Sequence, residues 1–412
     1  MVLMRALKMG LCAVLCLSAI DCGGSGDAGG GTTPPPPTST TNTASVTVDA
    51  GPSPTTSPSV NTMFTSVTVC VPGSTTNCQT IDHVQVDTGS YGLRLLASVL
   101  TVALPVETLA NGDSLTECTQ FVDGFSWGSV ATADIQIAGE TAKSLPVQVI
   151  GDTRFTNIPA ACSGTGGTEE DTVSTFGANG ILGIGPFESD CGDCDTVTHG
   201  LYYACAASCT DTTVPVNQQV PNPVTHFAVD NNGAIVVLPT VAAGGAANVT
   251  GSLIFGIDTQ SDNASGTQTV LTVDDDAELV MTFNGQTLAN SFIDSGSNGI
   301  FFADSSIVTC TAPPSDPTSQ IVNFYCPAST LTLGLSIQGM NGVMANNLTF
   351  GVGNAITMLD NPFDAYPQLG GTLPPGNAGT FDFGLPFFFG RRVAIAVQGA
   401  ITTVGTGPYI AF

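Results

Sequence analysis

A four-residue motif that occurs twice constrains this sequence more than any other feature. Asp87–Ser90 reads DTGS and Asp294–Ser297 reads DSGS, and the second copy begins 207 residues after the first. Each copy follows a short apolar, β-prone run, at residues 84–86 and 291–293. One such match is expected by chance at roughly 0.05 per chain, even with abundant Gly, Ser and Thr. The repetition therefore predicts two related halves that each place an aspartate at the end of a strand.

The repeated motif is suited to building a pair of carboxylates. Its Gly lets the backbone pass close to a neighbour, and its hydroxyls can bond the other half and the outer carboxylate oxygen. If Asp87 and Asp294 face each other, they cannot both ionise, so they share one proton and titrate in two steps. The ionised member can then take a proton from water while the protonated member polarises a carbonyl. This chemistry needs no metal and no cofactor.

The composition excludes several classes of protein. The 412 residues include 7 Lys and Arg against 33 Asp and Glu, a formal net charge of -26, so no basic stripe for nucleic acid can form. The 48 Gly and 26 Pro interrupt the chain too often for long helices. Hydrophobic residues make up 42% of the chain, which is enough for a large core. We expect a folded, mostly β protein.

Short strand patterns recur along both halves, separated by Gly, Pro and Asn. In the first half they cover residues 63–71, 81–86, 131–138, 145–150, 234–238 and 253–257. In the second half they cover residues 279–283, 291–293, 331–337, 348–352 and 393–397. The pattern predicts a two-lobed β protein, with one lobe at residues 61–240 and the other at 241–412.

The first 22 residues have the features of an export signal. Arg5 and Lys8 precede an apolar run from Met9 to Ile20, which is too short to cross a bilayer. The run leads to Cys22, and this arrangement resembles a bacterial lipoprotein signal, in which the cysteine is lipidated. We expect a protein of the periplasm or cell surface that is attached to the membrane through Cys22. Because Asp21 departs from the usual small residue, secretion without a lipid is the alternative.

Residues 23–60 are dominated by Gly, Thr, Ser and Pro. No stretch of this segment contains enough apolar residues to form a core, so we expect a disordered tether between the lipid and the lobes.

Ten cysteines follow the signal, and an even number in an exported chain predicts five disulfides. The spacing favours a Cys70–Cys78 pair around a hairpin tip and a Cys310–Cys326 pair around a short loop. Cys191, Cys194, Cys205 and Cys209 have spacings that would also suit zinc, but an oxidising compartment favours disulfides. We therefore expect no metal. The ten positions are 70, 78, 118, 162, 191, 194, 205, 209, 310 and 326.

From about residue 61 to residue 412 the sequence resembles the pepsin-like aspartic peptidases. The likeness rests on five landmarks in the order of that family: Asp87–Ser90, Gly180–Gly185, Ser252–Asp258, Asp294–Ser297 and Phe383–Phe389. The resemblance implies an all-β, bilobal pepsin-like fold, with two β-barrel-like lobes and a cleft between them. With the lipoprotein-like signal, the nearest likeness is to bacterial pepsin-like lipoproteins.

The resemblance also implies roles for the residues of the two motifs. Asp87 and Asp294 would be the catalytic pair, and Thr88 and Ser295 would bond across the lobes. Gly89 and Gly296 would allow the loops to approach closely, and Ser90 and Ser297 would bond the outer carboxylate oxygens.

Three positions depart from the family pattern. Ser295 stands where the family usually has Thr, although a hydroxyl is kept. The hairpin that covers the cleft has no Tyr, so Trp127 could offer an indole N–H there, or Phe125 could cover the cleft. A lone Trp is more often a core or rim aromatic than a catalytic substitute, and this alternative for Trp127 stays open. Arg94 takes the place of a family Trp, and a cation near the dyad would favour its ionised form.

These features predict a monomeric aspartic endopeptidase of the cell envelope that takes an extended peptide or protein substrate as an added strand. Two alternatives from other classes stay open. The missing flap Tyr and Arg94 suit a pepsin-fold protein that binds peptides or surfaces without turnover. The Thr-rich, acidic composition and the tether suit a surface adhesion module, which would not need Asp87 and Asp294 to adjoin.

Overall fold

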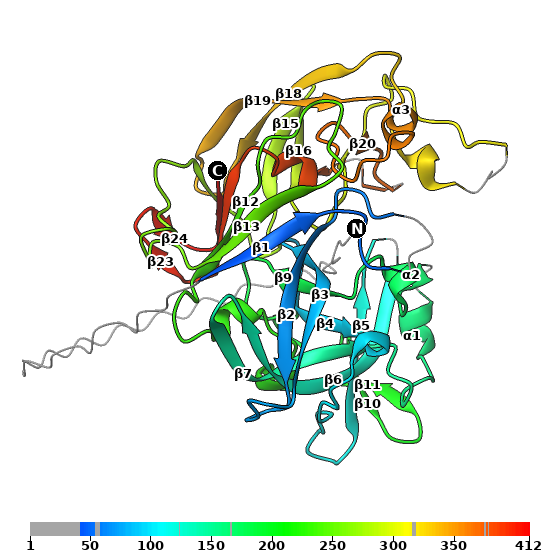
Figure 1. Cartoon of the computed structure of the whole chain (residues 1–412), viewed down its shortest axis with the longest axis vertical. Helices are drawn as coiled ribbons and strands as arrows, with labels where there is room; N and C mark the ends of the chain where they lie inside the picture. Colours follow the sequence, from blue (N-terminus) through cyan, green and yellow to red (C-terminus); the bar gives the residue numbers. More distant parts are fainter. Residues whose placement is uncertain are drawn as a thin grey trace, which may run out of the picture.

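The computed structural model describes residues 42–53, 58–122, 124–164, 167–314, 319–374, 376–377 and 379–412. These residues form two β-rich lobes, one above the other in Figure 1, with β1, β12 and β13 between them. Every strand segment predicted from the sequence overlaps an observed strand. The all-β, two-lobed architecture is therefore confirmed. The signal, Cys22 and the tether as far as residue 41 lie outside the described residues.

The N-terminal lobe consists mainly of one run of strands. They are β2 (Met63–Cys70), β3 (Cys78–Asp87), β4 (Tyr91–Leu96), β5 (Ser114–Gln120), β6 (Gly124–Ile137), β7 (Glu140–Ile150), β8 (Thr168–Glu169), β9 (Gly180–Ile184), β10 (Tyr202–Cys205) and β11 (Cys209–Asp211). Short helices lie between them: η1 (Ala97–Val99), α1 (Ala160–Ser163), α2 (Val173–Phe176), η2 (Val216–Gln218) and η3 (Pro223–His226).

The C-terminal lobe is built around a seven-stranded sheet in the order β19-β18-β15-β16-β21-β17-β20. Its strands are β15 (Leu279–Phe283), β16 (Gln286–Ile293), β17 (Ile300–Phe302), β18 (Leu331–Gln338), β19 (Met344–Val352), β20 (Gly370–Gly371) and β21 (Phe381–Phe383). The small elements are η4 (Gln320–Asn323), α3 (Ala355–Leu359), η5 (Leu385–Phe387) and the pair β23 (Ile401–Thr402) and β24 (Gly405–Thr406).

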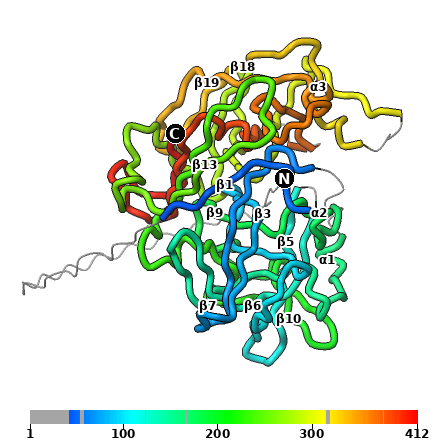
Figure 2. Tube along the Cα trace, in the orientation of Figure 1, coloured from blue at the N-terminus to red at the C-terminus, as the bar shows by residue number. Residues whose placement is uncertain are grey.

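Strands from both ends of the chain join the lobes. The order β1-β13-β12-β22-β25-β14 continues the sheet of the N-terminal lobe, and Figure 2 shows blue β1 beside green β13. These strands are β1 (Thr43–Val48), β12 (Gly233–Val237), β13 (Val249–Phe255), β14 (Val270–Thr272), β22 (Arg392–Ala396) and β25 (Tyr409–Ala411). Hydrogen bonds across this sheet hold the lobes together.

The prediction of a disordered tether as far as residue 60 is wrong for its described part. β1 pairs with β13 along its whole length and with β2 at its end. Val46 and Val48 are fully buried, because they alternate with polar residues and so share the inward face of the strand. β-branched Thr and Val favour this extended conformation despite the surrounding Gly and Pro.

The same three-strand arrangement occurs once in each lobe. β9 pairs parallel with β3 and antiparallel with β4, and β21 pairs parallel with β16 and antiparallel with β17. The register of these pairs matches positions between the lobes. Two residues before each motif aspartate, Gln85 faces Ile181 and Phe292 faces Asp382, so Ile181 and Asp382 occupy equivalent positions.

The two lobes fill their cores with different residues. Val and Leu side chains dominate the N-terminal lobe, whereas the C-terminal lobe packs a group of phenylalanine rings. Phe302 and Phe381 are stacked with centroids 5.1 Å apart, and Phe383 lies 4.8 Å from Phe381. Such ring pairs add about 0.5–1.5 kcal/mol each beyond the area they bury. This core supports β21, which carries Asp382.

The five expected disulfides are present. Cys70–Cys78 and Cys310–Cys326 form as predicted, and the others are Cys118–Cys162, Cys191–Cys194 and Cys205–Cys209.

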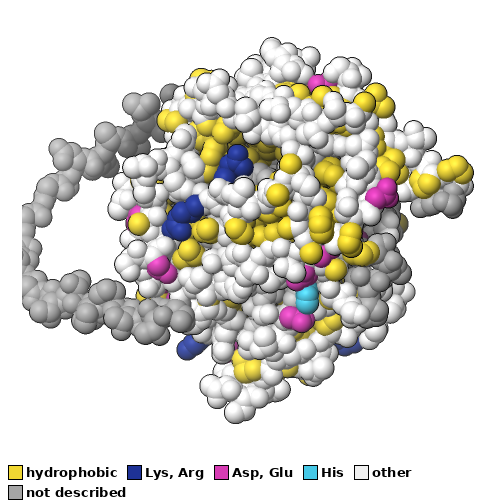
Figure 3. Space-filling view, turned by 45° about the horizontal axis from the view of Figure 1, so that its top comes forward, with side chains coloured by type: hydrophobic (Ala, Val, Ile, Leu, Met, Phe, Trp, Pro, Cys, Tyr) yellow, Lys and Arg dark blue, Asp and Glu magenta, His cyan; other side chains and the backbone are white. Residues whose placement is uncertain are grey.

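On the face in Figure 3, charged side chains are sparse among apolar and neutral ones. Within the described ranges, the chain contains no helix with the length and apolar character needed to span a bilayer.

Candidate active site

The fold brings the two motif aspartates together. Asp87 is the last residue of β3 and Asp294 directly follows β16, and both are fully buried. The glycines show how close the two loops approach. A Cβ on Gly89 would lie 2.6 Å from Cγ of Asp294, and one on Gly296 would lie 2.6 Å from Oδ1 of Asp87. Only glycine fits such contacts without a shift, which explains its place in both motifs.

Hydroxyl groups tie the two loops to each other. The Thr88 N–H donates to Ser295 Oγ at 3.1 Å, and the Ser295 N–H donates to Thr88 Oγ1 at 3.0 Å. Ser295 Oγ also donates to the Val86 carbonyl at 2.8 Å. Serine therefore makes the bonds expected of the usual threonine. The reciprocal bonds fix the position of one aspartate relative to the other.

Each aspartate is held by its own loop in the same way. The Gly89 N–H donates to Asp87 Oδ1 at 2.8 Å, and the Gly296 N–H donates to Asp294 Oδ1 at 2.7 Å. The serines bond the outer oxygens: Ser90 donates to Asp87 Oδ2, and Ser297 Oγ lies 3.1 Å from Asp294 Oδ2. The inner oxygens thus face the opposite carboxyl group.

Burial and proximity make this pair electrostatically unusual. The pKa of Asp294 is raised well above its ordinary value, first by burial and then by the charge of Asp87 and a hydrogen bond with it. Burial also raises the pKa of the Tyr91 hydroxyl, and Asp87 and Asp294 add to that rise. An aspartate that retains its proton beside an ionised one can act as an acid while its neighbour acts as a base.

The aromatic residues predicted to cover the cleft lie elsewhere. Phe125 and Trp127 are on β6, are 4% and 2% exposed, and pack with the Cys118–Cys162 disulfide and Tyr203. The Trp127 indole N–H donates to the Phe155 carbonyl at 2.6 Å. The suggestion that Trp127 or Phe125 replaces a flap Tyr is therefore wrong, because the register of the β5–β6 hairpin turns both side chains into the lobe.

Arg94 does not act on the dyad as expected. It is fully buried, with Nη2 2.6 Å from Glu117 and 3.0 Å from Asp190, and its Nε donates to Thr119 at 2.9 Å. Its charge is not among those that shift the pKa of Asp294. Two carboxyl groups already compensate this cation, so it anchors β5 to β4 instead of favouring an ionised dyad.

Two residues of the site region were not predicted from the sequence. Asp382 lies behind the C-terminal loop, with Oδ2 2.6 Å from Ser297 Oγ. Phe121, at the tip of the β5–β6 hairpin, packs against Phe176 and Ile181. The signal for Asp382 was present in the sequence, because a charged residue between Phe381 and Phe383 is unusual for a buried strand.

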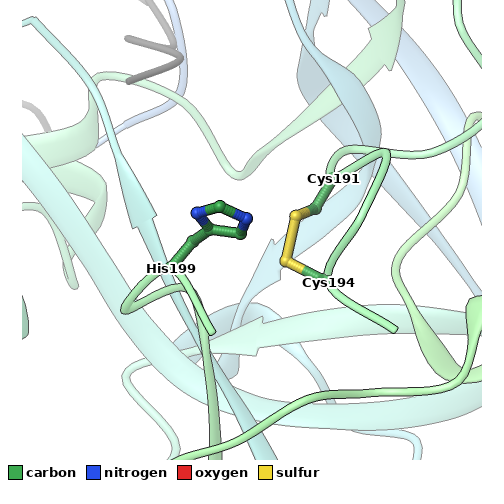
Figure 4. A group of neighbouring side chains, drawn as sticks. All are labelled: Cys191, Cys194 and His199. Atoms are coloured by element: carbon green, nitrogen blue, oxygen red, sulfur yellow. A yellow bond between two sulfur atoms is a disulfide. The ribbon is translucent and has the colours of Figure 1, made fainter. Parts of the chain in front are cut away.

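A second cluster of potential ligand atoms lies away from the dyad. The two sulfurs of Cys191 and Cys194 and a ring nitrogen of His199 lie within 4.8 Å of one another (Figure 4). The sulfurs are joined to each other, and a disulfide offers no thiolate to a metal. His199 Nε2 lies 2.7 Å from Asp193 Oδ1. The zinc alternative therefore lacks its thiolate ligands here.

Comparisons with known proteins support the fold. The structure is similar to the crystal structure of the aspartic proteinase from Irpex lacteus, with a TM-score of 0.50, 14% identity, and coverage of 90% of this chain and 96% of that one. This likeness identifies the fold as pepsin-like, as predicted. No curated protein matches the sequence. A family model described as "Protein of unknown function (DUF3443)" matches residues 38–412, and the chain therefore belongs to the DUF3443 family.

Proposed function

We propose that this protein is an aspartic endopeptidase. The proposal depends on one observation, the meeting of Asp87 and Asp294 carboxyl groups across two loops that are tied by Thr88 and Ser295. The carboxyls share a proton, so the ionised member takes a proton from water as that water attacks a peptide carbonyl. The protonated member donates to the carbonyl oxygen and stabilises the charge that develops on it.

The substrate we propose is an extended peptide or an unfolded protein. An extended peptide can add to an exposed strand edge through backbone hydrogen bonds, and we propose this mode of binding for the cleft between the lobes. We further propose a monomer that works in the periplasm or at the cell surface, attached through Cys22. The five disulfides and the signal-like N-terminus support export to an oxidising space.

The experiment compares wild type with Asp87→Asn and Asp294→Asn on a denatured protein between about pH 3 and 7, with and without pepstatin. We expect cleavage that pepstatin stops and that each variant lowers by about a thousandfold or more. Asp134→Asn is the control, because Asp134 is a mostly buried aspartate that caps backbone N–H groups in the N-terminal lobe. Undiminished cleavage by either dyad variant would exclude the proposed mechanism.

One observation favours a second candidate, a peptide-binding protein without turnover. Both aspartates are fully buried, and neither lines the cavities of about 320 and 500 Å³ that lie in the described part of the C-terminal lobe. Saturable binding of a peptide that the wild type leaves intact at every pH would support this candidate. Cleavage that stops in Asp294→Asn would exclude it.

A further inference from the structure

Ser297 lies between two buried carboxyl groups. Its Oγ is 3.1 Å from Oδ2 of Asp294 and 2.6 Å from Oδ2 of Asp382. Asp382 is 1% exposed and lies on β21, next to the strand that leads into Asp294. At the equivalent position of the N-terminal lobe stands Ile181. The C-terminal loop therefore has a third acid that its counterpart lacks.

Counting protons shows that one of the two carboxyls flanking Ser297 is protonated. A serine hydroxyl has one proton to donate and can accept through its lone pairs. If both contacts are hydrogen bonds, Ser297 donates to one carboxylate and accepts from a protonated carboxyl on the other side. Either Asp382 donates to Ser297 and Ser297 to Asp294, or the chain runs in the opposite direction.

The surroundings decide the direction. Asp294 Oδ1 also accepts the Gly296 N–H at 2.7 Å, so a negative charge on Asp294 has two hydrogen-bond donors, Gly296 and Ser297. Asp382 has only Ser297, and its Oδ1 lacks a hydrogen-bond partner among the described residues. A buried charge is costly unless it is hydrogen-bonded or paired. Of the two carboxyls that flank Ser297, Asp382 is therefore the one that donates its proton to Ser297.

No cation offers Asp382 a partner from the elements packed against it. β16, β17 and η5 contain no Lys, Arg or His, and among the described residues the acids Asp294 and Asp87 interact electrostatically with Asp382. Burial raises the pKa of Asp382 to about 8, the Ser297 hydrogen bond opposes that rise, and Asp87 adds to it. Burial also raises the pKa of the Tyr91 hydroxyl, so Tyr91 stays neutral.

We propose that Asp382 is a third, proton-bearing carboxyl of the active site, which rests on the proposed peptidase function and acts as a positioning residue. Protonated Asp382 donates to Ser297, and Ser297 then donates to Asp294 Oδ2, which lowers the cost of a charge on Asp294 when the proton shared by the dyad moves to Asp87. When Asp382 ionises, Ser297 turns its only proton towards Asp382. Asp294 Oδ2 then faces a lone pair of the Ser297 oxygen. The proton that Asp87 and Asp294 share moves towards Asp294 to relieve this repulsive contact. The upper pH limit of activity is therefore set by Asp382.

The kinetic test compares the pH profiles of wild type, Asp382→Asn and Asp382→Leu. An amide can donate to Ser297 at every pH, so the fall in kcat on the alkaline side should move up by about one pH unit or more in Asp382→Asn. Leucine offers no donor, so kcat should fall about tenfold with KM changed less than twofold, as for one lost hydrogen bond to a charged group. Asp134→Asn should keep the wild-type profile. Identical alkaline limbs in wild type and Asp382→Asn would overturn the proposal.

A second measurement does not depend on activity. Between about pH 5 and 7, folded Asp382 retains a proton that the unfolded chain has lost, so wild type should lose stability with rising pH more steeply than Asp382→Asn, by one proton. Equal slopes would overturn the role of Asp382 even in an active enzyme. A wild type that cleaves nothing, with slopes that differ by one proton, would overturn only the peptidase function.

Discussion

The two active-site loops make the same direct contacts to their aspartates, but they differ in the residue that packs behind each loop. Each has an aspartate whose inner oxygen accepts a glycine N–H and whose outer oxygen meets a serine. Behind the N-terminal loop, Ile181 packs with Phe121 and Phe176. Behind the C-terminal loop, the equivalent residue is Asp382. The matching direct contacts bring the two aspartates together, and the proposed role of Asp382 makes the two sides of the dyad unequal.

A second contrast concerns how the lobes treat buried charge. In the N-terminal lobe, one buried cation, Arg94, bonds both Glu117 and Asp190, and Tyr202 donates to Asp190 at 2.8 Å. Burial and the neighbouring Glu117 raise the pKa of Asp190, and Arg94 opposes that rise. Behind the C-terminal loop no cation is present among the packed elements. Asp382 therefore avoids an uncompensated buried charge by retaining its proton. Burial without a cation keeps a carboxyl neutral, and only a neutral carboxyl can donate a hydrogen bond.

The largest effect should come from placing a carboxyl group behind the N-terminal loop, at the position equivalent to Asp382. Ile181→Asp places a carboxyl among Phe121 and Phe176, and the cation opposite it in the β4–β9 pair, Arg94, is already bonded to Glu117 and Asp190. We expect the free energy of unfolding to fall by about 3–5 kcal/mol at pH 7, and by less at pH 4, where the carboxyl can stay protonated. Urea denaturation at the two pH values measures this. Ile181→Val, expected to cost about 1 kcal/mol at both, is the control. An equal loss at both pH values for Ile181→Asp would contradict the electrostatic explanation.

Adding a methyl group to each loop tests the symmetry of the direct contacts. In Gly89→Ala and Gly296→Ala the new Cβ meets the facing carboxyl at 2.6 Å, so one aspartate must move. We expect kcat/KM to fall about a hundredfold in both, because displacements near 1 Å have effects of this size. Gly244→Ala is the control, since its Cβ would meet no atom within 4 Å. A loss in only one of the two variants would show that the loops are not equivalent.

The sequence predicted the pair of aspartates but not Asp382 behind it, for a physical reason. Asp87 and Asp294 could be paired from the motif because the turn, the glycine and the hydroxyls are local features. Asp382 lies 85 residues after Ser297, and their contact depends on the register of β16 and β21, which short-range patterns do not determine. Trp127 was placed in the cleft for the same reason, since hairpin register decides which face a side chain takes.

β1 was missed for a different reason, the averaging of composition over a long segment. Gly, Thr, Ser and Pro dominate residues 23–60, and that average hid the alternation of Val46 and Val48 in β1. The strand is stabilised by pairing with β13, more than 200 residues away in the sequence. Composition over a long window predicts a tether well, but six alternating residues within it are enough to form a strand when a partner edge is available.

The third prediction concerns stability and pH. The folded-state pKa of Asp382 is raised to about 8 by burial, above the ordinary value near 3.9 for an unfolded chain. Its contribution to stability is therefore complete below about pH 4 and is lost as the pH rises towards 8. We expect a loss of about 1.4 kcal/mol for each pH unit in this window, with Asp294 acting in the same direction. Denaturant unfolding from pH 5 to 7 measures this, and stability that rises over that range would contradict it.

The smallest effect tests the bonds that make the loops one unit. Ser295→Ala removes the acceptor of the Thr88 N–H, and Thr88→Val removes the acceptor of the Ser295 N–H. Each leaves a buried N–H without its partner, so each should lower the free energy of unfolding by about 1–2 kcal/mol. Ser295→Thr keeps the hydroxyl and should stay near wild type. Since Ser295 also donates to the Val86 carbonyl, its loss should be the larger of the two. A larger loss in Thr88→Val would place the main link between the loops on the N-terminal hydroxyl.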